Sequence, residues 1–194
     1  MRYIPTGSRG VFRPTAGWGL VLLLVAHSLG ATTLDELRRD PYLTPERFAR
    51  YFTNFRYQFH AEVQQPGVFL ATKAGDCDDY AILAADVLKE KGYHPHLIAV
   101  RMPGLAHVVC YVEERKSYLD YNNRGYLKRT VRSDGTLPHI AQTVARSFDT
   151  CWTSASEFTY ANGIKQMGAT ISQTEAYRIQ PLVLSPPKKL DLNF

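Results

Sequence analysis

The stretch GDCDDY, residues 75–80, places a cysteine among three acids. A thiolate is a strong nucleophile, but neighbouring carboxylates repel it, so the acids need another explanation. The residues that follow have helical periodicity, and the first turn of a helix favours acids because its N–H groups are unpaired. We therefore predict that Asp76 caps a helix. We also expect Asp78 and Asp79 to point away from the side that carries Cys77, where the helix N-terminus favours a thiolate.

A nucleophilic cysteine also needs a base, and His107 is the best candidate. His107 begins the run HVVCYV, on the same strand face as Val109, and Asp120 follows in the next run, beyond the charged turn EERK. If this hairpin is centred on Glu114 and Arg115, Asp120 is a near or diagonal neighbour of His107 across the strands. Cys77, His107 and Asp120 would then form a nucleophile, a base and an orienting carboxylate, which suits acyl transfer.

The elements before and around Cys77 are predicted from spacing. The run LTPERFARYF indicates a helix capped by Thr44, with Pro45 at its first position. FRYQFH alternates and predicts a short strand, whereas EVQQPGVFLATKAG lacks periodicity and predicts a loop. From Asp76 a second helix runs to about Gly92, and its small residues on one face predict that it is the central, buried helix.

The second half of the chain is predicted to be mostly strands. HLIAVRM, AHVVCYV and SYLDY follow one another closely, which indicates an antiparallel meander. LPHIAQTVARSF predicts a helix, and ASEFTYA and GATISQT predict two later strands. Helices followed by strands indicate an α+β fold, with an N-terminally capped central helix packed on an antiparallel sheet.

The first thirty residues predict a signal peptide. Three arginines precede the apolar run WGLVLLLVA, and small residues follow at a cleavage position. The alternative is an uncleaved anchor, which would be the only membrane contact. We expect one domain over residues 31–180 and an extended surface tail over 181–194. Without residues 1–30 the net charge falls from +5 to +2, and no basic stripe favours nucleic acid as a partner.

The motifs around these candidates resemble a known family. GDCDDYAILAADVLKEKGY, AHVVCYV and YLDYNN are similar to the core of bacterial transglutaminase-like cysteine peptidases, in the papain-like superfamily. The resemblance extends over roughly residues 48–127 and implies Cys77 as nucleophile, His107 as general base and Asp120 as its orienting group. It also implies an upstream residue that donates to the oxyanion, for which Tyr57 and Gln58 are the candidates. The backbone N–H of Cys77 or of its neighbour would be a further donor.

The resemblance implies an exported hydrolase that acts in the periplasm or outside the cell. Its substrate would be a peptide or protein, or peptidoglycan, and it would require no cofactor. Two alternatives stay open: an inactive module that binds peptide or cell-wall glycan, and a true transglutaminase. The acids do not follow the calcium-loop pattern, although Asp78 or Asp79 holding calcium is an alternative, as in some relatives. The histidines lack zinc-finger spacing, so no metal is expected.

The remaining cysteines and histidines have structural interpretations. Cys110 and Cys151 are either a disulfide or two buried thiols, and the sequence alone does not choose between these. The other four histidines of the domain are interpreted as structural or exposed: His60, His94, His96 and His139.

Overall fold

The computed structural model describes residues 32–126 and 129–179 of the 194-residue chain. The predicted signal peptide and the predicted surface tail lie outside these described residues. Within them, no helix is long and apolar enough to cross a membrane. Eight elements lead up to and include the first hairpin: α1 (Leu34–Arg39), α2 (Pro45–Tyr51), β1 (Arg56–Tyr57), α3 (Pro66–Thr72), β2 (Ala74–Gly75), α4 (Cys77–Glu90), β3 (Pro95–Met102) and β4 (Leu105–Val112).

The rest of the described chain completes the sheet. It contains the 3₁₀ turns η1 (Glu113–Arg115) and η2 (Tyr121–Asn123), the strands β5 (Ser117–Leu119), β6 (Thr130–Arg132), β7 (Ser154–Ala161) and β8 (Ile164–Ser172), and the helices α5 (Leu137–Ser147) and α6 (Gln173–Ile179). Six strands form one antiparallel sheet in the order β6-β5-β4-β3-β7-β8. The predicted α+β class is confirmed.

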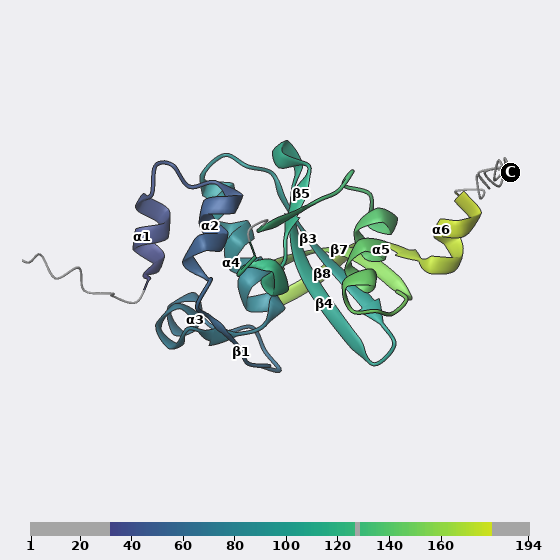
Figure 1. Cartoon of the computed structure of the whole chain (residues 1–194), viewed down its shortest axis with the longest axis horizontal. Helices are drawn as coiled ribbons and strands as arrows, with labels where there is room; N and C mark the ends of the chain where they lie inside the picture. The colour runs from purple at the N-terminus through teal and green to yellow at the C-terminus, as the bar shows by residue number, and fades with distance from the viewer. Residues whose placement is uncertain (1–31, 127–128, 180–194) are drawn as a thin grey trace, which may run out of the picture. The chain divides into compact units, whose positions relative to one another are not determined.

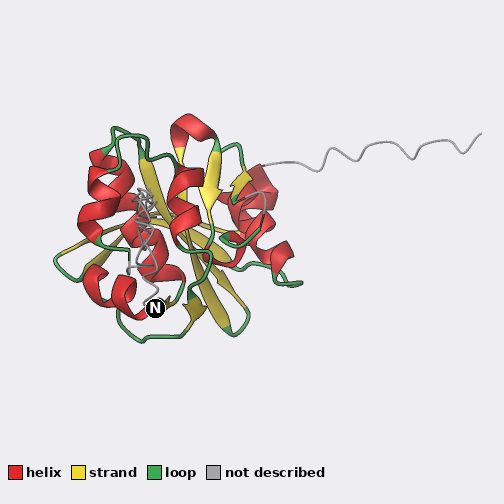
Figure 2. Cartoon of the chain, turned by 60° about the vertical axis from the view of Figure 1, so that its left-hand side comes forward, coloured by secondary structure: helices red, strands yellow, loops and turns green. Residues whose placement is uncertain are grey.

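Helices cover both faces of this sheet (Figures 1 and 2). Helix α4 packs on β3 and β4 from one side, and α5 packs on β3 and β7 from the other. Alternation along β4 divides its side chains between two cores, because neighbouring residues of a strand face opposite ways. Cys110 belongs to the core on the α4 side, whereas Val109 belongs to the core on the α5 side.

The central helix begins as predicted. The Asp76 side chain accepts a hydrogen bond from the N–H of Asp78, and the Asp79 side chain accepts one from the N–H of Asp76, which makes a reciprocal cap. Most of α4 is buried, and a run of small and aliphatic residues lets it lie close to the sheet. The predicted start of α2 is also confirmed, since the Thr44 side chain accepts from the N–H of Arg47.

The segment 62–75, predicted to be a loop, is partly helical, and that prediction was wrong. Helix α3 spans seven residues and starts with Pro66 at its first position. So short a helix shows little periodicity in sequence, and tertiary packing stabilises it. Its buried Phe69 packs against Phe52 and Phe55, with ring centroids 5.6 and 5.1 Å away.

The disulfide between Cys110 and Cys151 is not formed, because all three cysteines are free thiols. Cys110 is buried in the core on the α4 side of the sheet. Cys151 is exposed, and the next residue, Trp152, lies in the core on the α5 side. The alternative of a buried thiol holds for Cys110, and burial raises its pKa well above the ordinary value.

Candidate active site

Cys77 is the first residue of α4. Just before it, Gly75 lets the backbone lie close against the side chains of Asp79 and Phe69. A Cβ atom on Gly75 would lie 2.5 Å from Asp79 Oδ2 and 2.6 Å from the ring of Phe69. Asp79 is 3% exposed and accepts hydrogen bonds from the main-chain N–H and the side-chain amide of Gln64, each at 2.7 Å. These contacts fix the start of the helix, and with it the position of Cys77.

His107 and Asp120 are brought together by the β4–β5 hairpin. The register pairs Val112 with Ser117, so the hairpin is centred between Glu114 and Arg115, as predicted. After β5 the chain turns into η2, and Asp120 caps this turn by accepting from the N–H of Asn122 at 2.8 Å.

Nε2 of His107 lies 2.9 Å from Oδ1 of Asp120, and both residues are buried, at 4% and 1% exposure. The ring also packs edge-on against Phe148, with centroids 5.0 Å apart. A buried imidazole held in this way has little freedom to rotate. The carboxylate therefore fixes the ring's orientation.

The pKa of His107 is affected by Cys77 as well as by Asp120. Burial lowers this pKa, but hydrogen bonds and charge interactions with Asp120 and Cys77 outweigh the burial and raise it to about 10. The structure thus brings the imidazole of His107 to Asp120, and the position of Cys77 as its further partner stays a prediction.

Asp78 does not point away from Cys77, contrary to the prediction. Its Oδ1 lies 3.6 Å from the sulfur of Cys77, and its Oδ2 forms an ion pair with Lys165 from β8. The prediction treated the helix alone, whereas the lysine comes from a strand 87 positions further along the chain. Its ammonium offsets the charge of a carboxylate that would otherwise repel a thiolate.

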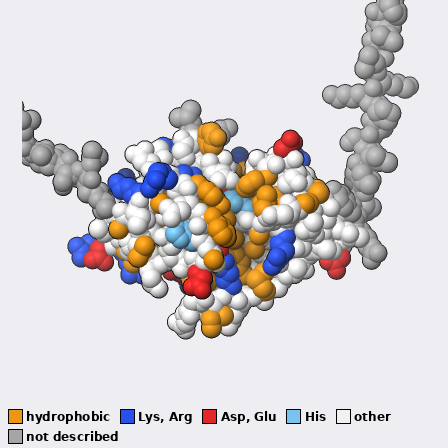
Figure 3. Space-filling model, turned by 90° about the horizontal axis from the view of Figure 1, so that it is seen from below, with side chains coloured by type: hydrophobic (Ala, Val, Ile, Leu, Met, Phe, Trp, Pro, Cys, Tyr) orange, Lys and Arg blue, Asp and Glu red, His pale blue; other side chains and the backbone are white. Residues whose placement is uncertain are grey.

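A cavity of about 290 Å³ opens at Cys77. Its apolar walls come from three regions: Tyr57 and Phe59 before the helix, Ala99, Ala106 and Val108 on the sheet, and Phe158 and Met167 on the β7–β8 hairpin. Arg101 and Lys165 add positive charge. Figure 3 shows the molecule from below, where apolar side chains form a band with Lys, Arg and His side chains beside it.

The two candidate oxyanion donors differ in position. Tyr57 lines the cavity, and its pKa is raised by burial and by the negative charges of Cys77, Asp76 and Asp78. Gln58 is exposed and does not line the cavity, and its main-chain N–H donates to the carbonyl of Gly75 at 2.8 Å. The structure therefore brings Tyr57, but not the side chain of Gln58, to the site.

The sequence interpretation missed His60, which was expected to be structural or exposed. His60 lines the same cavity as Cys77, and its main-chain N–H donates to Oδ2 of Asp76 at 2.9 Å. The parallel pairing of β1 with β2 places it there; the run FRYQFH predicted a short strand, but nothing local in the sequence indicated its partner strand.

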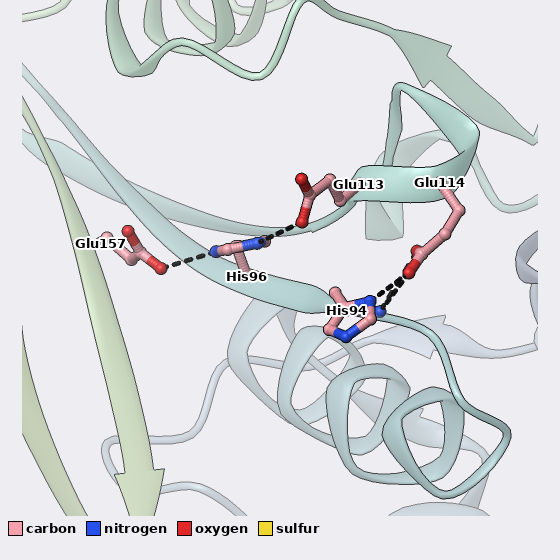
Figure 4. Close-up of polar contacts among 5 residues, drawn as sticks. All are labelled: His94, His96, Glu113, Glu114 and Glu157. Carbon is pink, nitrogen blue, oxygen red and sulfur yellow. Dashed lines mark hydrogen bonds and ion pairs between the residues drawn. The ribbon is translucent and has the colours of Figure 1, made fainter.

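The other histidines do lie away from the cavity. His94 pairs with Glu114, and Nδ1 of His96 lies 2.7 Å from Glu157, while its Nε2 is 3.8 Å from Glu113 (Figure 4). Nδ1 of His139 lies 2.9 Å from the hydroxyl of Ser133. These contacts join neighbouring elements and fit the predicted structural roles.

The acids at the helix start are the nearest approach to a calcium site around Cys77. Ligand atoms of Asp76, Cys77 and Asp78 lie within 4.8 Å of one another. Calcium takes six to eight oxygen ligands, whereas this group includes a thiol. The carboxylate oxygens of Asp76 accept main-chain N–H groups, and Asp78 is paired with Lys165. As arranged, these residues do not fit a calcium ion.

Residues 41–122 match a family model described as a transglutaminase-like domain. The matched part of the chain, 82 of its 194 residues, is similar to a transglutaminase-like domain. The match includes Cys77, His107 and Asp120, and it ends before the β7–β8 hairpin that lines the cavity. The predicted resemblance to bacterial transglutaminase-like proteins is therefore confirmed.

Solved structures of LapG from Legionella pneumophila are similar to this chain. One is 16% identical, with a TM-score of 0.44, and the alignment covers 75% of this chain and 77% of LapG. A calcium-bound LapG is 17% identical, with a TM-score of 0.44 and coverage of 76% and 85%. An EGTA-treated LapG is 17% identical, with a TM-score of 0.42 and coverage of 70% and 75%. The comparison with curated proteins found no match.

Proposed function

We propose that this protein is a thiol-dependent acyl-transfer enzyme that hydrolyses amide bonds in a peptide or protein. Cys77 is the nucleophile, His107 the general base and Asp120 the group that orients it. One observation carries the proposal: the buried imidazole of His107 lies 2.9 Å from the carboxylate of Asp120, and Cys77 is among the groups that raise the pKa of His107. Acyl transfer needs a nucleophile, a base beside it and a group that orients the base.

The raised pKa of His107 favours a charged imidazolium near neutral pH, and its proton comes from the thiol of Cys77. The thiolate attacks the amide carbonyl carbon, and the electron pair of the C=O bond moves to oxygen. When the tetrahedral intermediate collapses, the C–N bond breaks and the imidazolium protonates the leaving amine. A thioester on Cys77 remains. Water, deprotonated by His107, attacks the thioester and releases the acid and the thiol.

The cavity suits a polypeptide with apolar side chains beside the scissile bond. Its walls are largely apolar, and Arg101 and Lys165 would attract acidic groups or a carboxylate. Peptidoglycan peptides carry such groups and are a second substrate of the same reaction class. We infer export to the periplasm or outside the cell from residues 1–30 alone, and we expect no nucleic-acid partner.

The proposal needs no cofactor, because side chains supply both the nucleophile and the proton transfers. The mechanism has no step through calcium, since Lys165 already provides the cation beside Asp78. Calcium-bound and EGTA-treated forms are reported for LapG. Adding EGTA to this protein is therefore a simple control, which should leave turnover unchanged.

Alkylation with iodoacetamide tests the proposal, and the exposed thiol of Cys151 serves as an internal reference. Peptide mapping after short exposures between pH 5 and 9 gives the labelling rate of each cysteine. At pH 6 we expect Cys77 to react about tenfold faster than Cys151, because a thiolate is the reactive form. His107→Ala should remove this advantage, and Cys77→Ala should abolish hydrolysis of 4-nitrophenyl acetate.

A different labelling result would contradict the enzyme. If Cys77 labels only above pH 8, and His107→Ala does not change its rate, the thiol is not activated. A non-catalytic module that binds peptide or glycan would then be favoured. Unchanged ester hydrolysis by Cys77→Ala would rule out the mechanism directly.

A further inference from the structure

One of the residues that line the Cys77 cavity, His60, has a buried ring nitrogen without a hydrogen-bond partner. Among the described residues, four buried side-chain polar atoms have no hydrogen-bond partner: His60 Nε2, Tyr80 Oη, Arg124 Nε and Arg129 Nε. Of these four residues, only His60 lines the cavity at Cys77. A buried polar group without a hydrogen-bond partner is unfavourable for folding, so an unpaired nitrogen at this position needs an explanation. A partner that arrives with the substrate would be such a reason.

Main-chain hydrogen bonds fix the position of His60 next to the nucleophile. The N–H groups of Arg56 and Gln58 donate to the carbonyls of Lys73 and Gly75, both at 2.8 Å. The N–H of His60 continues this series and donates to the carboxylate of Asp76 at 2.9 Å. Three alternate residues are thus pinned to the segment that leads into Cys77. These hydrogen bonds come from main-chain N–H groups. Replacing the side chain of residue 60 should therefore leave the backbone beside Cys77 unchanged.

The reaction develops a negative charge close to this place. When the thiolate attacks, the carbonyl oxygen becomes an oxyanion, and preorganised donors aimed at it lower the barrier. Cys77 is the first residue of α4, so its own N–H has no partner within the helix and can serve as one donor. A second donor is needed on another side of the oxygen. Nε2 of His60 is unpaired and shielded from solvent, and His60 is one of the residues that line the same cavity.

We propose that His60 is a catalytic residue whose Nε2–H donates a hydrogen bond to the oxyanion formed during attack by Cys77. This inference rests on the acyl-transfer function proposed above. In the donation no bond to His60 forms or breaks, and its proton stays on Nε2. The electron pair that moves to the carbonyl oxygen returns when the leaving group departs.

Two electrophiles separate this role from a structural one. 4-Nitrophenyl acetate acylates Cys77 through a tetrahedral oxyanion and releases nitrophenolate, whereas iodoacetamide alkylates the sulfur by displacing iodide and forms no oxyanion. We expect His60→Ala to lower the acylation rate about 10²-fold while the alkylation rate stays within about threefold. His60→Gln places an amide N–H at a similar reach, and it should restore acylation to within about tenfold of the wild type.

Matched variants make the result decisive. His139→Ala removes a histidine away from the cavity and should leave both rates unchanged. The inference is overturned if His60→Ala acylates normally, if both rates fall together, or if His60→Gln is as slow as His60→Ala. A 10²-fold loss in Tyr57→Phe with none in His60→Ala would also overturn it and assign the donor to Tyr57. If the wild type and Cys77→Ala acylate equally slowly, the proposed function itself fails.

Discussion

The two sides of the Cys77 site differ in burial and in what they contribute. On one side, His107 and Asp120 are almost fully buried. On the other, the β7–β8 hairpin is open to solvent, and Met167 is 52% exposed. A buried, hydrogen-bonded pair is preorganised and keeps its geometry without substrate, whereas an exposed strand is available for binding. The buried side lies within the transglutaminase-like match, and the hairpin lies outside it.

We infer from this difference that the two sides contribute separately to the chemical step and to substrate binding. The matched residues 41–122 hold the groups that we assign to the chemistry, and the later hairpin supplies contacts that a substrate would meet. Changes on the buried side should therefore alter the rate of the chemical step, and changes on the hairpin should alter substrate binding or the local charge.

The largest effects should come from the buried pair. His107→Ala removes the base, and we expect kcat for 4-nitrophenyl acetate to fall by about 10³-fold. Asp120→Asn keeps a similar shape but removes the charge that orients and stabilises the imidazolium, so the fall should be smaller, about 10- to 10²-fold. Steady-state kinetics with circular dichroism as a fold control measures both. A greater loss in Asp120→Asn than in His107→Ala would contradict the assigned roles.

The same pair predicts a dependence of stability on pH. The pKa of His107 is raised from 6.5 to about 10 in the folded protein, against the opposing effect of burial, by Asp120 and Cys77. A raised pKa means that the folded state holds the proton more tightly, so the stabilisation is fully present below about pH 6.5. It is lost as the pH rises towards 10.

Thermal unfolding of the wild type and Asp120→Asn measures this effect. We expect the wild type to have the higher Tm at pH 6, by on the order of 5 °C, with the difference shrinking steadily up to pH 10. A difference that grows with pH, or that stays constant, would show that His107 is not held as an imidazolium in the folded state.

The hairpin register explains why the buried side could be predicted from sequence. The turn EERK and the alternation of its flanking strands define the pairing of β4 with β5, and this pairing places Asp120 near His107. The capped helix at Cys77 was predictable for the same reason, because caps and turns are local. Local signals therefore predicted two helix starts, the central meander and the three residues assigned to catalysis.

The open side depends on contacts that no local pattern encodes. β7 pairs with β3, which lies more than fifty positions earlier, so the position of Lys165 follows from the assembled sheet. Asp78 also lies beside the sulfur of Cys77, and the charge that offsets its carboxylate comes from Lys165 on this distant strand. His60 reaches the cavity through a two-residue parallel pairing, and α3 is stabilised by the burial of Phe69. These features could be identified only from the folded structure.

The smallest effect should come from the hairpin, at Lys165. Lys165→Met removes the cation paired with Asp78, whose other oxygen lies 3.6 Å from the sulfur of Cys77. An uncompensated carboxylate disfavours the thiolate, so alkylation of Cys77 at pH 6 should slow by about threefold, and its pH profile should move towards higher pH. The ion pair is partly exposed, so Tm should change little.

Lys165→Arg is the matched variant, because it keeps the positive charge at the same position. It should retain the wild-type alkylation profile. If Lys165→Arg and Lys165→Met slow alkylation equally, the shape of the lysine rather than its charge affects the thiol. If Lys165→Met instead slows acylation as strongly as His107→Ala does, the hairpin takes part in the chemical step, and the contrast between the two sides of the site does not hold.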